Sequence, residues 1–305
     1  MPVGTADHII ECRNISKVYG SIIFKEKIYA LTDINIALDQ GEICGLVGSN
    51  GTGKSTLMKV IMGIEPRQKG DIIICCTNKH IGYIPERPIF FDDDDAFHNL
   101  LYFARLSHVE DPEKKCKESL IEFGLGDKGN TMVNGFSTGM KQRLAIARSL
   151  LNDPEILTMD EPFSGLDPTA VIEVREHLLK MKQQGKTILL SSHDLSEIDK
   201  VCDSIIFIEN GKVVRKQSLH SVQTSVNVHI LLQEKSDKAL EIARSMGLHV
   251  ALKDDLNMIV EIEKESIPDL LQSLTEAHVR IVESRIIQRT SEDFYTEIFV
   301  KEGSK

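Results

Sequence analysis

The chain reads Gly45-Leu46-Val47-Gly48-Ser49-Asn50-Gly51-Thr52-Gly53-Lys54-Ser55-Thr56 at the stretch that decides its fold. From Gly48 to Ser55 it matches the phosphate-binding pattern G-x-x-x-x-G-K-[ST]. We expect a buried strand from Glu42 to Val47 to end in this loop, and a helix from Ser55 to Gly63 to leave it. The glycines let successive backbone N–H groups point inward, which makes a cradle for phosphate oxygens at a helix N-terminus. The sequence therefore predicts a nucleotide-binding site.

The polar residues of this loop have predicted roles. Lys54 is placed to reach the β- and γ-phosphates, and the Ser55 hydroxyl is placed to bind Mg²⁺. The loop residues expected to contact the nucleotide are Ser49, Asn50, Gly51, Thr52, Gly53, Lys54, Ser55 and Thr56.

Composition narrows the class of protein. With 305 residues, 41% of them hydrophobic and 27% charged, the chain has the make-up of an ordinary globular protein, and its length favours two domains. We expect no membrane span and no secretion signal, because no apolar run reaches the required length of about 18 residues. The six cysteines show no C-x-x-C pairing, which indicates reduced cysteines in a cytosolic protein. The net charge is −10 without an evident basic face, which argues against nucleic acid as a partner.

The order of elements predicts an α/β fold. Residues 9–16 and 28–37 alternate apolar and polar side chains, as expected for strands of an antiparallel section with Tyr19-Gly20 between them. Later strands, most of them apolar throughout, alternate with helices, which is typical of a largely parallel sheet. Such sheets bind ligands at the carboxyl ends of their strands. The phosphate loop, Asp160-Glu161 and His193 all fall at predicted strand ends.

Asp160 and Glu161 follow the short buried strand Ile156 to Met159. A carboxylate at that position is suited to hold Mg²⁺ through water. Because adjacent residues leave a strand on opposite sides, Glu161 is expected to point differently from Asp160. Glu161 is therefore the candidate base or orienting group for an attacking water.

The amino-acid composition of the chain changes near residue 218. Residues 218–225 are rich in serine and threonine and are predicted to be a linker between a domain at 1–217 and one at 226–305. The second part reads strand, helix, strand, strand, helix, strand, with a last helix expected at 292–300. That order predicts a small α+β, ferredoxin-like domain.

Further motifs resemble those of ABC-type ATPases. Phe136-Ser137-Thr138-Gly139-Met140 is similar to the family's signature loop, usually L-S-G-G-Q. Met159-Asp160-Glu161-Pro162, Ser164-Gly165-Leu166-Asp167-Pro168 and Ser192-His193-Asp194 resemble its Walker B segment, D-loop and switch histidine, in the right order. The resemblance covers roughly residues 9–216 and implies a P-loop ATPase domain with a helical subdomain at about 87–150. It is greatest to ATP-binding subunits of exporters whose permease is a separate chain.

The resemblance also implies a mechanism. Such domains work as head-to-tail pairs, with ATP held between the phosphate loop of one copy and the signature loop of the other. Lys54, Glu161 and His193 would then act in catalysis, and Ser55, Glu86 and Asp160 would hold Mg²⁺. The further residues implied to contact ATP are Tyr19, which would stack on adenine, together with Glu86, Ser137, Thr138, Gly139, Met140 and Asp167.

Some positions depart from the family pattern. Thr138 and Met140 stand where glycine and glutamine are usual, and Glu86 stands where glutamine is usual. The implied partners are an integral membrane permease and a second copy of this chain, and the implied location is the cytoplasmic face of the cell membrane. A soluble regulator that uses ATP-dependent dimerisation as a switch is the alternative.

Overall fold

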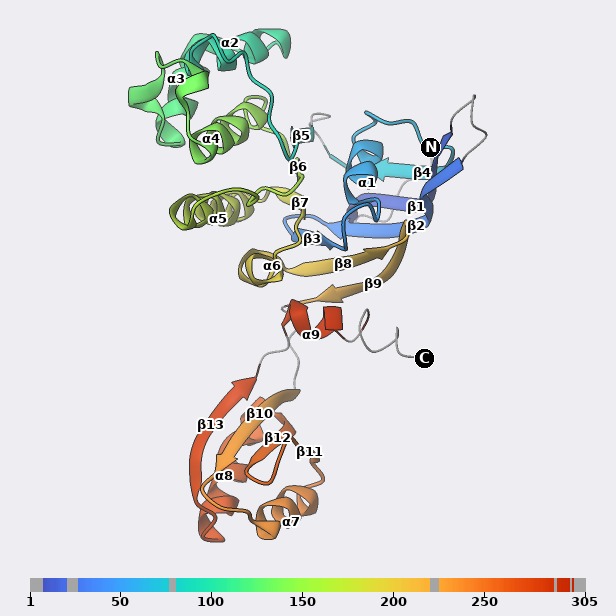
Figure 1. Cartoon of the computed structure of the whole chain (residues 1–305), viewed down its shortest axis with the longest axis vertical. Coiled ribbons are helices and arrows are strands. Elements are labelled where there is room, and N and C mark those ends of the chain that lie inside the picture. The colour runs from blue at the N-terminus through green and yellow to red at the C-terminus, as the bar shows by residue number, and fades with distance from the viewer. Residues whose placement is uncertain are drawn as a thin grey trace. The chain divides into compact units, whose positions relative to one another are not determined.

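The computed structural model describes residues 8–20, 27–76, 81–219, 225–287, 290–296 and 298. These residues form two compact units, divided after Leu219 and again after Phe294 (Figure 1). No helix among the described residues is long and apolar enough to cross a membrane.

A six-stranded sheet forms the centre of the first unit. Its order is β5-β6-β7-β3-β8-β9, with the first five strands parallel and β9 antiparallel. The bounds are β3 Ile43–Val47, β5 Ile81–Ile84, β6 Ile156–Met159, β7 Thr187–Ser191, β8 Ser204–Glu209 and β9 Lys212–Ser218. Every residue of β3, β6 and β7 is buried, which is the condition that selects uninterrupted apolar strands.

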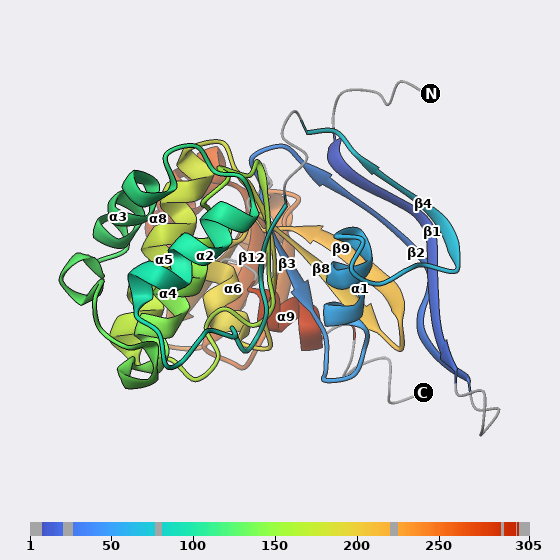
Figure 2. The ribbon, with the colours of Figure 1, turned by 90° about the horizontal axis from the view of Figure 1, so that it is seen from above.

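A second, three-stranded sheet has the antiparallel order β2-β1-β4, with β1 His8–Gly20, β2 Lys27–Asp39 and β4 Lys69–Ile74. The prediction that Tyr19-Gly20 lies between two strands is wrong, because Tyr19 pairs with Ile28 inside the ladder. Helix α1, Lys54–Ile61, lies with this sheet (Figure 2). Buried residues of both sheets and of α1 form one core, including Ile15, Leu31 and Leu57.

A group of helices stands apart from α1 in Figures 1 and 2. It consists of α2 Ala96–Leu106, α3 Pro112–Glu122 and α4 Thr138–Ser149, with the 3₁₀ turns η1 Gly126–Lys128 and η2 Val133–Gly135. Asp95, the last residue of the acidic run, caps α2 by accepting from the His98 N–H at 2.8 Å. The acidic run, Asp92 to Asp95, therefore places negative charge at a helix N-terminus, where it is favourable.

Two more helices complete this unit, α5 Pro168–Gln183 and α6 Leu195–Val201. Asp167 caps α5 by accepting from the Ala170 N–H at 3.0 Å, and Pro168 is the first residue of the helix. Gly185 follows the helix with a φ of +83°, a conformation that favours glycine.

The second unit is a four-stranded antiparallel sheet of order β11-β12-β10-β13 with helices between its strands. Its elements are β10 Ser225–Leu232, α7 Asp237–Ser245, β11 His249–Leu252, β12 Asn257–Glu263, η3 Lys264–Ser266, α8 Ile267–Glu276 and β13 Ile281–Ile287. The last helix, α9 Ser291–Tyr295, contains the second division of the chain, after Phe294. Its own core includes Val228, Val260 and Leu270. The strand and helix order agrees with the sequence, whereas the ferredoxin-like assignment stays a prediction.

Two predicted boundaries shift. Ser218 and Ser225, placed in the linker, lie in β9 and β10. Residues 220–224 between them, and residues 297 and 299–300 of the predicted last helix, lie outside the described residues.

Candidate nucleotide-binding site

The phosphate loop joins β3, a central strand of the sheet, to α1, as predicted. The Thr52 hydroxyl donates to the Ser49 carbonyl at 2.8 Å and closes the loop on itself. Asn50 and Gly51 are exposed at its tip, whereas Ser55 and Thr56 are half-buried in the first turn of α1.

The three glycines of the loop are required for different reasons. A Cβ on Gly48 would lie 2.2 Å from the Ile208 carbonyl oxygen of β8, so this glycine is set by packing against a neighbouring strand. Gly53 has a φ of +106° and lies against the Ala30 carbonyl. Gly51 has a φ of +81° but open space around it. The sequence predicted the curl of the backbone but not the close approach of β8.

These differences predict that alanine substitutions at Gly48 and Gly51 destabilise the protein to different extents. We expect Gly48→Ala to lower the free energy of unfolding by about 1–3 kcal/mol, because the backbone of β8 must move to admit the methyl group. The matched change Gly51→Ala meets no atom and should cost about 1 kcal/mol from its backbone conformation alone. Urea unfolding of the two variants measures the difference, and equal losses would contradict this account of Gly48.

Lys54 is a buried cation that forms no salt bridge with the residues that the structure describes. Its side chain is 6% exposed, and its Nζ donates to the carbonyls of Gly48 at 2.7 Å and Ser49 at 3.1 Å. Burial lowers the pKa of Lys54, and the charges of Glu161 and Asp160 oppose that shift. Two carbonyls thus hold the ammonium group at the loop, and its positive charge is not neutralised by a bound carboxylate.

Asp160 lies directly after β6 and is buried. Its Oδ1 accepts from the Ser191 hydroxyl at 2.6 Å, and the same Ser191 oxygen accepts from the Glu161 N–H at 2.9 Å. Ser191, the last residue of the neighbouring strand β7, therefore fixes both carboxylate residues. The sequence reasoning missed Ser191. The sequence did offer a signal for this role, because Ser191 is a small polar residue that ends a buried strand two positions before His193.

Glu161 and His193 meet across the same two strand ends. His193 Nδ1 lies 2.8 Å from Glu161 Oε2, and the His193 side chain is 66% exposed. Glu161 has a φ of +49°, an uncommon left-handed conformation for a residue other than glycine. The two carboxylates have different partners, Ser191 for Asp160 and His193 for Glu161. Alternation along a strand is not the reason, because β6 ends at Met159.

The oxygen groups at this edge suit a hard cation such as Mg²⁺, which prefers carboxylate and hydroxyl ligands. They are the buried Asp160 carboxylate and the half-buried Ser55 hydroxyl. Glu86 is exposed two residues beyond Ile84, whose carbonyl accepts from the Asp160 N–H at 2.8 Å. A buried lysine held by carbonyls, with hydroxyl and carboxylate groups beyond the ends of β3 and β6, fits a triphosphate with its cation.

The segment 137–140 begins α4. The Ser137 hydroxyl accepts from the Met140 N–H at 3.2 Å, and Ser137 and Thr138 are exposed. Gly139 is buried, and a Cβ on it would lie 2.8 Å from Ala170 Cβ on α5. Its small size is thus required by helix packing, which the sequence did not predict. No hydrogen bond or ion pair between described residues joins this segment to the phosphate loop of the same chain.

The remaining predicted residues lie farther out. Tyr19, in β1, is 37% exposed, and Lys17 Nζ lies 4.7 Å from the centre of its ring. Asp167 is exposed at the start of α5.

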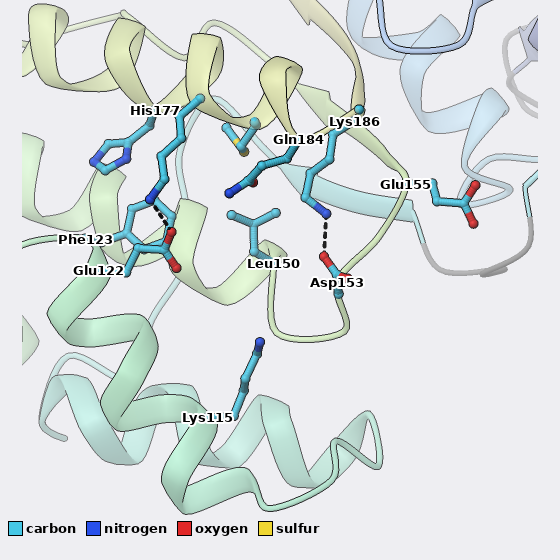
Figure 3. A pocket seen from close by; sticks show the side chains of 12 residues that line it. Lys115, Glu122, Phe123, Leu150, Asp153, Glu155, His177, Gln184 and Lys186 are labelled. Atoms are coloured by element: carbon cyan, nitrogen blue, oxygen red, sulfur yellow. Dashed lines mark hydrogen bonds and ion pairs between the residues drawn. The ribbon is translucent and has the colours of Figure 1, made fainter.

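A cavity of about 490 Å³ lies at the other end of the sheet, between α3, α5 and the loop before β6 (Figure 3). Lys180 pairs with Glu122 at 2.7 Å and Lys186 with Asp153 at 2.5 Å. These pairs neutralise two of the three lysines that line the cavity, and the third is Lys115 of α3.

The comparisons with known proteins agree with this geometry. A family model described as ABC transporter matches residues 31–164. The uncharacterized ABC transporter ATP-binding protein YhcH of Bacillus subtilis (strain 168) is 31% identical over 302 residues, covering 95% of each chain. The lantibiotic transport ATP-binding protein SrtF of Streptococcus pyogenes is 34% identical over 236 residues, which is 74% of this chain and all of SrtF. The dimeric post-hydrolysis structure of the cassette MJ0796 with ADP and Pi has a TM-score of 0.63 at 26% identity, covering 70% of this chain and 99% of that one.

A phosphate loop after a central parallel strand, with an acidic pair and a histidine on neighbouring strand ends, defines a P-loop nucleoside triphosphatase. Within that class, this chain belongs to the ATP-binding proteins of ABC transporters. It is therefore an ATPase subunit of a transporter. Cassettes of this family dimerise and work with membrane permease subunits.

Proposed function

We propose that two copies of this chain bind ATP between them and hydrolyse it to drive export through a separate membrane permease. The observation that carries the proposal is the division of the site. The phosphate loop, Asp160, Glu161 and His193 meet in one chain, whereas Ser137 is exposed on α4 with no bond to that loop. A second copy in head-to-tail orientation would bring its own Ser137 and the N–H groups of α4 to the triphosphate, where a helix N-terminus favours negative charge.

Each residue of this half-site then has a role. Lys54 and the loop N–H groups bind the β- and γ-phosphates, and Ser137, Thr138, Gly139 and Met140 bind from the facing copy. Ser55, Asp160 and Glu86 would hold Mg²⁺, which supplies positive charge to the phosphoryl group during its transfer. Tyr19 would stack on adenine, and Asp167 would lie at the interface between copies.

Hydrolysis needs an oriented water. The Glu161 carboxylate can only accept, so His193 Nδ1 carries the hydrogen of their 2.8 Å contact and Nε2 stays available to the γ-phosphate. Glu161 orients the water and takes its proton, while Lys54 and His193 stabilise negative charge on the phosphate oxygens. Positioning and charge supply the catalysis, and no covalent intermediate forms.

The division of labour along the chain is part of the proposal. Residues 1–217 would form the ATPase domain with a helical subdomain at about 87–150, and residues 226–305 an accessory domain. The two compact units support that division. The ATPase would lie at the cytoplasmic face of the membrane through its permease. The export direction is supported by the similarity to the Nod factor export ATP-binding protein I of Cupriavidus pinatubonensis, which is 30% identical over 233 residues.

The surface around α2 supports a permease contact. Large apolar side chains gather there in an exposed group, the α2 patch, made of Ile89, Phe91, Tyr102 and Leu106. Phe91 and Tyr102 contact each other edge to face, with ring centres 4.9 Å apart. Exposed apolar patches of this kind mark protein interfaces.

This surface gives the test of the proposed function. We expect the full chain, carrying an affinity tag and purified from detergent-solubilised membranes, to recover an integral membrane protein. The double change Tyr102→Asp and Leu106→Asp should lower that recovery by about tenfold or more. Ile121→Asp, which alters an exposed apolar residue of α3, is the matched control and should recover the wild-type amount. Recovery of no membrane protein by the unaltered chain would favour the soluble regulator instead.

A further inference from the structure

The sheet of the second unit ends on a strand with a free edge. Among the described residues, β13 is paired with β10 alone, and it forms one outer side of this sheet in Figure 1. Residues 282–286 of β13 are all exposed, including the apolar Val282 at 61% and Ile286 at 44%. An exposed edge of this length with apolar side chains can pair with a strand from another chain.

The sequence of β13 is complementary to itself. It reads Ile281-Val282-Glu283-Ser284-Arg285-Ile286-Ile287. When two copies of the strand run antiparallel with Ser284 of each at the two-fold axis, Glu283 of one copy faces Arg285 of the other, twice. The same alignment sets Val282 opposite Ile286. A two-fold interface requires this kind of self-complementary surface.

The charges lie where they can meet. Glu283 and Arg285 are opposite Leu231 and His229 of β10, so both leave the same face of the sheet. Within one chain, Arg285 Nε lies 3.5 Å from Glu283 Oε1, and both side chains are largely exposed. Such an exposed ion pair contributes little free energy, so each side chain can pair with the opposite charge of a second copy instead. The irregular step of the β10–β13 ladder precedes Glu283, so residues 283–287 form its regular part.

We propose that β13 is an interface with a second copy of this chain, in which two four-stranded sheets join into one continuous antiparallel sheet. Charged residues on an edge strand ordinarily discourage pairing. In β13, opposite charges lie symmetrically about Ser284. They favour pairing with β13 of a second copy and disfavour pairing with strands that lack this charge pattern. The contact needs no nucleotide, so it is independent of the ATP-bound pairing proposed for the ATPase domain.

A charge-swap series on the full chain tests the interface. Without nucleotide, sedimentation should show a dimer whose dissociation constant rises about tenfold in Glu283→Arg and in Arg285→Glu, because each change sets two like charges opposite each other. The double variant Glu283→Arg/Arg285→Glu restores the pattern and should recover the wild-type constant within about threefold. Failure of the double variant to recover, or a wild-type chain that is monomeric without nucleotide, would overturn the proposal.

Cross-linking tests the register. Opposed Cα atoms in an antiparallel pair are about 4.5–5.5 Å apart, which permits a disulfide. In a background with Cys75→Ser and Cys76→Ser, Ser284→Cys should form a disulfide-linked dimer under mild oxidation. Ser245→Cys, exposed at the end of α7, is the control and should not. Equal cross-linking at both positions would exclude this register.

The two dimers can be told apart. The single charge variants should lose the nucleotide-free dimer but keep ATP-dependent association, because residues 283 and 285 lie outside the ATPase unit. Loss of both associations in these variants would overturn the independence of the β13 interface.

Discussion

Glu161→Gln is expected to lower the rate of ATP hydrolysis by about a thousandfold, within the usual range for the loss of a general base. The amide cannot take a proton from water, whereas its oxygen can still accept a hydrogen bond from His193. Glutamine has nearly the same size as glutamate, so the contact with Ser191 through the backbone N–H, 2.9 Å long, should persist. Phosphate release measures the rate.

Binding of ATP should survive this change, because Lys54 and the loop N–H groups are untouched. We therefore expect the variant to accumulate as an ATP-bound dimer, which size-exclusion chromatography with ATP and Mg²⁺ would show. Glu176→Gln, an exposed carboxylate on α5, is the matched control and should turn over at the wild-type rate. Unchanged hydrolysis in Glu161→Gln would remove Glu161 from the mechanism.

The sequence predicted the parts of this protein that neighbouring residues determine. The phosphate loop depends on groups within a few positions of each other, and the structure places it between β3 and α1, where the pattern indicates. The parallel sheet was predictable as well, because strands buried on both faces are mainly apolar. That sheet brings Asp160 and His193 to one edge, as expected.

Contacts between distant segments were beyond such reasoning. Ser191 holds Asp160 and Glu161 across 30 or more positions of sequence, and only the pairing of β6 with β7 brings it there. The close approaches of Ile208 to Gly48 and of Ala170 to Gly139 have the same origin. A motif shows that glycine is required at a position, but it does not show which distant residue packs against that glycine in the folded chain.

Lys54→Met should separate stability from function. Folding buries the Lys54 ammonium and lowers its pKa, so the folded protein disfavours this charge relative to water. Methionine fills similar space without charge, and although the bonds to the Gly48 and Ser49 carbonyls are lost, we expect the nucleotide-free protein to melt at the same temperature or about 2–4 °C higher.

The same change should weaken ATP binding by about a hundredfold, the loss expected for one charged hydrogen-bonding group. Nucleotide fluorescence titration and thermal melting of the same samples check both effects, with Lys59→Met on α1 as the matched control. A variant that melts well below the wild type would show that Lys54 holds the empty loop together. The expected result, stability without binding, would mean that the loop keeps a buried positive charge for the phosphates at the expense of its own stability.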